Sequence, residues 1–144
     1  MASLPINKGQ KSPLAHCLLV PILLALVSAG LFLASCSSVP APIPEALGPS
    51  ELLQKGQDYS ERNNYEEAIR YYQAVLDRFS SDLTYICTAD YEIAFIHYKQ
   101  KRMVEAEAGF RALLKRYESP DAALLPAQFR VLSEKLLAKI EQAK

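Results

Sequence analysis

The sequence has few residues that could carry catalytic chemistry. It contains two histidines and three cysteines, and no stretch has the spacing of metal ligands, a phosphate-binding glycine loop or a serine nucleophile elbow. His97, the sole histidine after Cys36, lies among apolar residues, and we interpret it as a core residue rather than a base or a ligand. We interpret the paired carboxylates as solvated helix faces or caps: Glu66, Glu67, Glu105 and Glu107. We therefore expect neither an enzyme nor a cofactor-binding protein.

Charge of one sign is also lacking, since the chain has 16 basic and 16 acidic residues. All the acidic residues follow Cys36, whereas Lys8 and Lys11 precede it, so the part after Cys36 has a small net negative charge. A nucleic-acid partner would favour a concentrated basic face, and we expect none. The short basic cluster around Lys101 is interpreted as a solvated turn.

The N-terminal residues 1–35 have the pattern of an export signal. Two lysines precede an apolar run over residues 14–33, and Leu33-Ala34-Ser35-Cys36 provides small residues before a cysteine. This tetrapeptide resembles a bacterial lipobox, which implies a signal peptide over 1–35 and a diacylglycerol and palmitate-type lipid on Cys36. The alternative is an uncleaved membrane anchor, because about 20 apolar residues also span a bilayer. Either way the rest of the chain lies across the membrane from the lysines.

A lipidated Cys36 would fix the protein to its membrane, because two or more acyl chains anchor stably. If the sorting rule of enteric bacteria applies, Ser37 implies transfer to the outer membrane, facing the periplasm of the cell envelope. Residues 36–49 form the lipidated cysteine and a tether with four prolines, which we expect to be extended over roughly 35 Å. Cys87 then has no cysteine to pair with inside the exported part, and is either a small buried residue or a link between two chains.

One pattern of apolar residues occurs twice, at residues 52–79 and 90–117. The two copies superpose with a constant offset of 38 residues, which is typical of a repeat architecture. The matched positions of the second helices are Tyr65, Ala68, Tyr72, Val75, Leu76 and Phe79 in the first copy, and Met103, Ala106, Phe110, Leu113, Leu114 and Tyr117 in the second.

These copies resemble the tetratricopeptide repeat (TPR) family. Gly56, Tyr59, Ala68, Tyr72 and Val75 match the family pattern in copy one, and Ala94, Ala106, Phe110 and Leu113 match it in copy two. The pattern departs from the family at Leu52 and Asp90, at the missing terminal proline, and in its spacing, which exceeds the usual period of about 34 residues. Longer spacing of this kind is similar to envelope TPR lipoproteins such as those of outer-membrane assembly or of the Tol-Pal system.

The resemblance implies an all-α domain over residues 50–144, built from two antiparallel helical hairpins and a C-terminal capping helix, after an N-terminal signal helix. We expect helices over about 50–62, 64–79, from Asp82 onward and over 103–117. Pro126 either kinks the last helix or begins it. The closing apolar stripe is predicted to comprise Phe129, Leu132, Leu136, Leu137 and Ile140. Two repeats and a cap lie near the lower limit for stability, so we also expect a possible homo-oligomer.

The third helix carries a second apolar stripe that the repeat does not require. In TPR domains the first helix of each hairpin lines the concave surface, and the matching candidate partner-binding residues are Leu53, Gln57, Ser60, Tyr91, Phe95, Tyr98 and Lys99. The lysine and asparagine clamp that some TPR proteins use for carboxylates is missing. We leave open whether the aromatic residues line a groove or are core covered by the C-terminal helix or by a second copy.

Two functions follow from this pattern. The first is a membrane-anchored TPR lipoprotein that acts as a protein–protein interaction scaffold in the cell envelope and binds a peptide or partner protein. The alternative is a small-ligand carrier or transport accessory lipoprotein, which a deep closed pocket around Tyr91, Phe95 and Tyr98 would favour.

Overall fold

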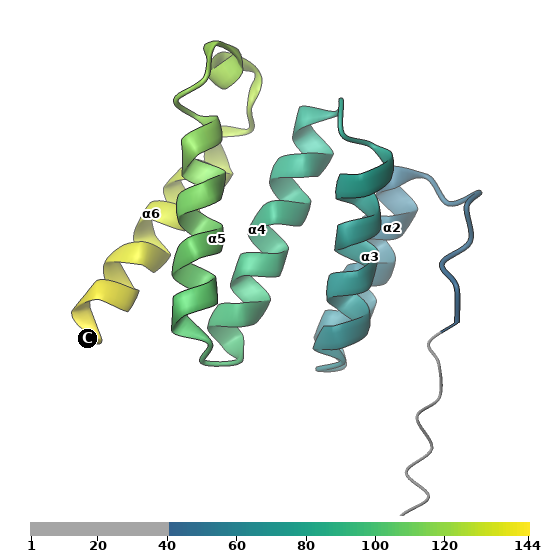
Figure 1. Cartoon of the computed structure of the whole chain (residues 1–144), viewed down its shortest axis with the longest axis horizontal. Helices are drawn as coiled ribbons and strands as arrows, with labels where there is room; N and C mark the ends of the chain where they lie inside the picture. Colours follow the sequence, from purple (N-terminus) through teal and green to yellow (C-terminus); the bar gives the residue numbers. More distant parts are fainter. Residues whose placement is uncertain (1–40) are drawn as a thin grey trace, which may run out of the picture. The chain divides into compact units, whose positions relative to one another are not determined.

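A computed structural model describes residues 41–144, and Cys36 and the predicted signal peptide lie outside this range. Residues 42–144 form one compact unit of α-helices (Figure 1). The helices are α2 (Pro49–Glu61), α3 (Tyr65–Arg78), α4 (Leu83–Lys99), α5 (Met103–Arg116) and α6 (Ala127–Gln142), with a 3₁₀ turn, η2, at Pro120–Leu124. The described part contains no strand, and the all-α prediction is confirmed. None of its helices is long and apolar enough to cross a bilayer.

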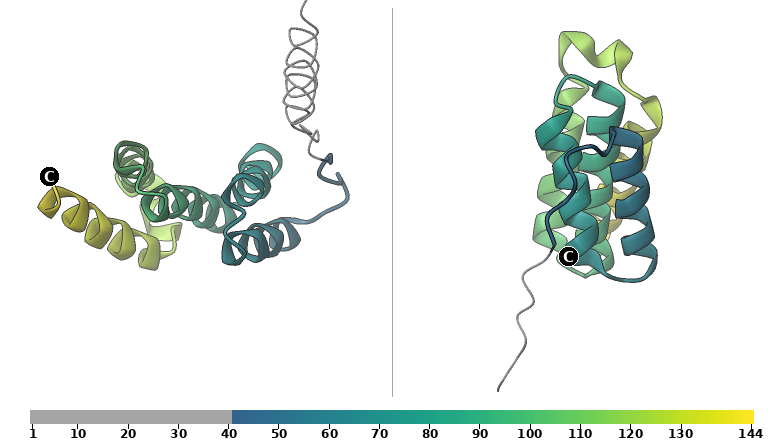
Figure 2. Two further views of the ribbon diagram at one scale, coloured as in Figure 1. Left: turned by 90° about the horizontal axis from the view of Figure 1, so that it is seen from below. Right: turned by 90° about the vertical axis from the view of Figure 1, so that its right-hand side faces the viewer.

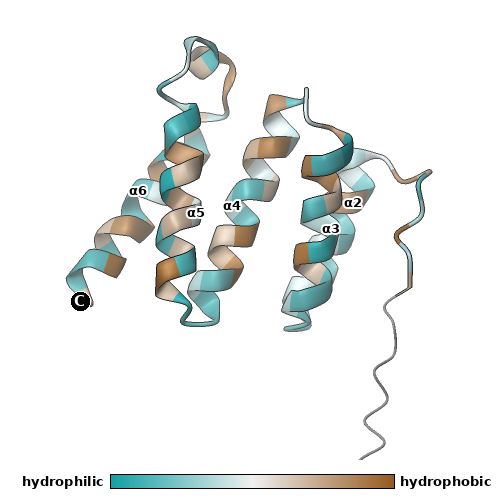
Figure 3. Ribbon diagram, viewed as in Figure 1, coloured by the Kyte–Doolittle hydropathy of each residue, from teal (hydrophilic) through white to brown (hydrophobic). Residues whose placement is uncertain are grey.

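The helix ends follow from local chemistry. Asn64 accepts a hydrogen bond from the Glu67 N–H, and Asp82 accepts from the N–H groups of Thr84 and Tyr85, so each satisfies exposed donors of a first turn. Pro126 begins α6 rather than kinking it. Polar and apolar residues alternate along α3 and α5, as expected for helices that bury one face (Figure 3).

The helices are arranged as two hairpins followed by α6. Helix α2 packs against α3, α4 packs against α3 and α5, and α6 packs against α5. Figure 2 shows that α2, α4 and α6 lie along one side of the domain, with α3 and α5 on the other. The side formed by the first helices is therefore the concave surface that the repeat pattern predicts.

Each hairpin buries an aromatic side chain at the position that the repeat pattern predicts. Tyr72 is 1% exposed and Phe110 is fully buried, which confirms that both belong to the core. The two hairpins reach this close packing differently. A side chain on Gly56 would meet the Tyr72 ring at 2.5 Å, whereas in the second hairpin a side chain on Gly109 would meet the Ala94 Cβ at 2.7 Å. The glycine thus lies on the first helix of one hairpin and on the second helix of the other.

Helix α6 docks on the second hairpin as α4 docks on the first. The α4 residues that pack into the core between α2 and α3 recur on α6 with a constant spacing of 44 residues: Tyr85, Ala89, Ile93 and Ile96 correspond to Phe129, Ser133, Leu137 and Ile140. Ser133 is fully buried, whereas Leu132 is 40% exposed. The prediction that Leu132 belongs to the closing stripe is therefore wrong. Ser133, which corresponds to Ala89 of α4, takes that buried position, and its neighbour Leu132 consequently lies at the surface.

The C-terminal part of the predicted tether is docked on the domain. Arg78 donates to the carbonyl oxygens of Ile43 (3.0 Å) and Pro44 (2.8 Å), while Ile43 and Leu47 pack against the core of the first hairpin. Pro49 is already the first residue of α2. Ile43, Pro44, Leu47 and Pro49 of the predicted tether are therefore part of the folded domain, and residues 36–40 lie outside the described range.

Replacing Gly56 by alanine should destabilise the domain by about 1–3 kcal/mol, because the new methyl group overlaps the buried Tyr72 ring. Urea unfolding followed by circular dichroism measures the change. Gln57→Ala, on the exposed neighbouring position, is the matched control and should alter the free energy of unfolding far less. Equal effects of the two substitutions would contradict the close approach of α2 and Tyr72.

Candidate functional site

One strip of α4 lies outside the most buried parts of the core. Thr88, Glu92, Phe95 and Lys99 are spaced by four, three and four residues, so they share one face of the helix. All four retain some exposure to solvent, whereas the flanking faces of α4 contribute buried residues to the two core clusters. Helices α2 and α6 both contact α4 and lie on the same side of the domain as α4 (Figure 2). We call these four residues the α4 strip.

Lys99 joins three helices at one end of the α4 strip. Its Nζ donates a 2.7 Å hydrogen bond to Ser60 Oγ at the end of α2. The same ammonium lies 4.9 Å from the centroid of the Tyr65 ring and 5.3 Å from that of Phe95, both within range of a cation–π contact. Ser60 and Lys99, two of the predicted partner-binding residues, are thus brought together, and Ser60 is buried by the contact.

One ring of the predicted aromatic stripe is buried, and the other two are partly exposed. Tyr91 stacks on Phe95, which stacks on Tyr98, with centroid separations of 5.8 and 6.3 Å. Tyr91 also packs 5.3 Å from Phe129 of α6 and is only 8% exposed. Helix α6 therefore covers Tyr91, whereas Phe95 and Tyr98 remain half-buried. For Tyr91 the structure corresponds to the alternative of a covered core.

The α2 wall carries the remaining predicted residues. Leu53 is half-buried against the core of the first hairpin, and Gln57 is exposed one turn further along. The Gln57 side chain donates a long hydrogen bond, 3.4 Å, to Glu61 on the same helix. Gln57 is therefore held by a weak contact that a bound partner could replace.

Glu92 is a residue of this site that the sequence analysis missed. Burial raises the pKa of its carboxyl, and the Lys99 ammonium opposes the shift. Within residues 41–144 no group donates a hydrogen bond to it. The spacing of Glu92, Phe95 and Lys99 places the three residues on one face of a helix, so the sequence did contain a signal for this site. A single carboxylate in a helix, however, is normally interpreted as a solvated residue.

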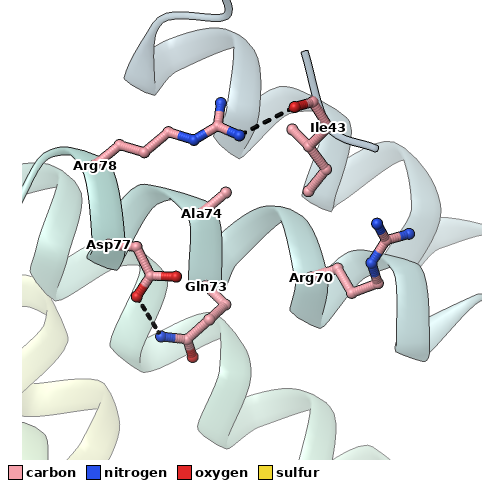
Figure 4. A pocket seen from close by; sticks show the side chains of 6 residues that line it. All are labelled: Ile43, Arg70, Gln73, Ala74, Asp77 and Arg78. Atoms are coloured by element: carbon pink, nitrogen blue, oxygen red, sulfur yellow. Dashed lines mark hydrogen bonds between the residues drawn. The ribbon is translucent and has the colours of Figure 1, made fainter. Parts of the chain in front are cut away.

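A second hollow lies against the outer side of the first hairpin. A cavity of about 310 Å³ is lined by Ile43, Arg70, Gln73, Ala74, Asp77 and Arg78 (Figure 4). Its polar groups are engaged: Gln73 donates to Asp77, Arg70 pairs with Glu67, and Arg78 holds the docked chain. The cavity lies between the docked Ile43 and the surface of α3, and we assign no binding role to it.

Cys87 and His97 lie away from the α4 strip. Burial raises the pKa of the fully buried Cys87 thiol, so it remains protonated and unreactive at neutral pH. Burial and the nearby Arg102 guanidinium lower the pKa of His97, which is therefore neutral at pH 7. Neither arrangement resembles an activated nucleophile or base.

Comparisons with known proteins agree with this arrangement. Residues 52–82 and 88–119 match the family model described as Tetratricopeptide repeat. The two matched segments coincide with the two hairpins, which are thus similar to tetratricopeptide repeats. Such repeats are protein–protein interaction scaffolds and are generally not catalytic.

The chain is also similar to an uncharacterized protein of Treponema pallidum (strain Nichols), with 35% identity over 104 residues. The similarity covers 71% of this chain and 42% of the relative, so the chain spans less than half the length of that protein. No solved structure matches.

Replacing Glu92 by glutamine should stabilise the domain at pH 7 and leave it nearly unchanged below about pH 4. The folded state holds the Glu92 proton more tightly than the unfolded state, so the wild-type domain loses stability as pH rises from the ordinary carboxyl pKa through the raised one. Urea unfolding of both proteins between pH 3.5 and pH 7 measures the difference.

Glu66→Gln is the control for this series, because Glu66 is an exposed carboxylate in the first turn of α3. A stability difference between wild type and Glu92→Gln that does not grow with pH would contradict the burial of the Glu92 carboxylate.

Proposed function

We propose that this protein is a membrane-anchored scaffold of the bacterial cell envelope, which captures a segment of a partner protein between α2 and α6. The observation that carries the proposal is the α4 strip. It places an aromatic ring, a carboxylate and an ammonium on one face of α4, in the layer of first helices, and all three side chains keep some exposure to solvent. A half-buried ring such as Phe95 offers contact area at low entropic cost, as hot spots of interfaces do.

The anchor is supported by the sequence before the described residues. A lipid on Cys36 would leave seven residues to Ile43, which is docked by Arg78. Even a fully extended chain of this length spans only about 25 Å. The repeat domain would thus be held close to the lipid surface, and Ser37 supports an outer-membrane location on the periplasmic side.

The alternative of a small-ligand carrier has less support. It required a closed pocket around Tyr91, Phe95 and Tyr98, but Phe95 stacks on both tyrosines and Tyr91 also packs against Phe129, so the rings contact one another rather than surround a ligand. The exposed edges of Phe95 and Tyr98 suit a flat contact with a peptide chain better than enclosure of a small molecule.

Cys36→Ser should abolish acylation and release the protein from the membrane, because the acyl chains supply the anchoring free energy. Metabolic labelling with radioactive palmitate and Triton X-114 partitioning measure both effects in cells. Cys87→Ser, which removes a buried thiol that no lipid could reach, is the matched control. Labelled Cys36→Ser protein in the detergent phase would rule out the lipoprotein assignment.

Phe95→Ala should abolish capture of the partner with little loss of helicity, whereas Tyr91→Ala should lower stability by about 3–5 kcal/mol, as truncation of a buried aromatic residue does. In-cell crosslinking of each variant, compared with wild type, measures capture, and thermal unfolding measures stability. Crosslinks that persist in folded Phe95→Ala protein would contradict the assignment of the groove.

A further inference from the structure

The apolar side chains that the domain leaves at its surface gather at the start of α6. Four large apolar residues are exposed among residues 41–144, and three of them are Leu124, Val131 and Leu132, with exposed fractions of 69%, 48% and 40%. Leu124 ends the 3₁₀ turn before α6, and the other two are neighbours on α6 itself. Single exposed apolar residues are common on protein surfaces, whereas a group of them favours a contact surface.

The same face of α6 carries two lysines that have no ion-pair partner in the described part of the chain. Lys135 lies four residues after Val131 and Lys139 lies seven after Leu132, so the lysines share the face of the apolar pair. Both are exposed, and neither forms an ion pair or a side-chain hydrogen bond within residues 41–144. We call these four residues the α6 face. The other charged side chains of α6 are all engaged: Arg130 with Glu134, and Glu141 with Arg111 and Lys144.

The other end of the layer of first helices carries complementary features. A shallow hollow of about 400 Å³ on the outer side of α2 is lined by Leu47, Ser50, Glu51, Gln54, Lys55 and Asp58. Leu47 provides a half-buried apolar side chain, and two carboxylates stand against one ammonium. Glu51 accepts a hydrogen bond from the Gly48 N–H and Asp58 accepts one from Gln54, but neither forms an ion pair within residues 41–144. We call this surface the α2 hollow.

We propose that the α6 face of one copy of this protein docks on the α2 hollow of a second copy. The apolar pair of the α6 face then lies against Leu47, and its two lysines face Glu51 and Asp58. The occupant is a second copy because the two surfaces of this chain are opposite in charge, and an apolar pair on one meets a hollow with an apolar lining on the other.

The arrangement of the helices makes this contact head-to-tail. Helices α2 and α6 lie at opposite ends of their layer (Figure 2), so a copy that uses its α6 face still offers its α2 hollow. Such a contact joins copies into rows or rings. Pairing of identical surfaces is disfavoured, because two α6 faces would bring four ammonium groups together and two α2 hollows would bring four carboxylates together. The α4 strip takes no part, so the inference goes beyond partner capture.

The test uses the full chain in detergent, with micelles in excess over protein, and measures sedimentation velocity as the protein concentration rises. The wild type should form assemblies larger than a dimer. Rising ionic strength should weaken them, because the charges of both surfaces are exposed. A wild-type chain that stays monomeric, or an assembly that stops at a dimer, would overturn the inference.

Two charge-reversed variants identify the surfaces. Lys135→Glu with Lys139→Glu, and Glu51→Lys with Asp58→Lys, should each raise the apparent dissociation constant at least about tenfold, since each places like charges across the contact. An equal mixture of the two variants should associate again, because each meets the opposite charge on the other. Lys115→Glu, which reverses an exposed charge of α5, is the control and should associate as the wild type does.

Circular dichroism shows whether each variant is folded. If loss of the Glu51 cap unfolds the α2 variant, Asp58→Lys alone takes its place. Leu132→Gln tests the apolar part of the contact without a change of charge, and should also weaken association. Association that is unchanged in either folded charge variant, or a mixture of the two that stays monomeric, would contradict the head-to-tail contact.

Discussion

The close approach of the paired helices is the constraint on which the rest of the structure depends. In each hairpin one helix must lack a side chain where the other presses against it. The first hairpin meets this requirement with Gly56 under the Tyr72 ring, and the second with Gly109 against Ala94. Both solutions let the two helices of a hairpin approach closely, and the first helices α2 and α4 lie on one side of the domain (Figure 2). A core packed at this density has no room for the methyl group that either glycine lacks.

This packing leaves α4 in an unusual position. It packs against α3 of the first hairpin on one flank and against α5 and α6 on the other, so apolar residues occur on both flanks. The α4 strip lies between these flanks and keeps some exposure to solvent. The Lys99 ammonium links α4 to the end of α2 through a hydrogen bond to Ser60 Oγ. Side chains that are ordered before a partner arrives lower the entropic cost of binding.

Much of this fold could be predicted from the sequence, and the reasons are local. The offset of 38 residues, the caps at Asn64 and Asp82 and the break at Pro126 depend on neighbouring residues, so the sequence contains the information needed to place the helices. The left-handed turn residues illustrate the limit. Asn63 and Lys101 are equivalent and have φ angles of 59° and 63°, yet only asparagine signals this conformation by its type.

The candidate site was less predictable because it depends on contacts between distant segments. Whether Tyr91 lines a groove or is core is decided by where α6 lies, more than 30 residues later. Arg78 recognises backbone carbonyl groups of Ile43 and Pro44, and every residue has such a group, so no side chain marks the docking position. The partial burial of Glu92 likewise depends on how the helices pack, and its position in the sequence alone does not reveal it.

The register of α6 also determines which side chains its outer flank presents. On α4, Tyr91 is one of the residues that meet the following helix, and the same spacing of 44 residues puts Lys135 in its place on α6. A helix laid on that flank of α6 would meet the exposed Lys135 ammonium, which is costly to bury without a partner, where the flank of α4 offers the Tyr91 ring. The aromatic contact that joins α4 to α6 therefore has no equivalent on the outer flank of α6.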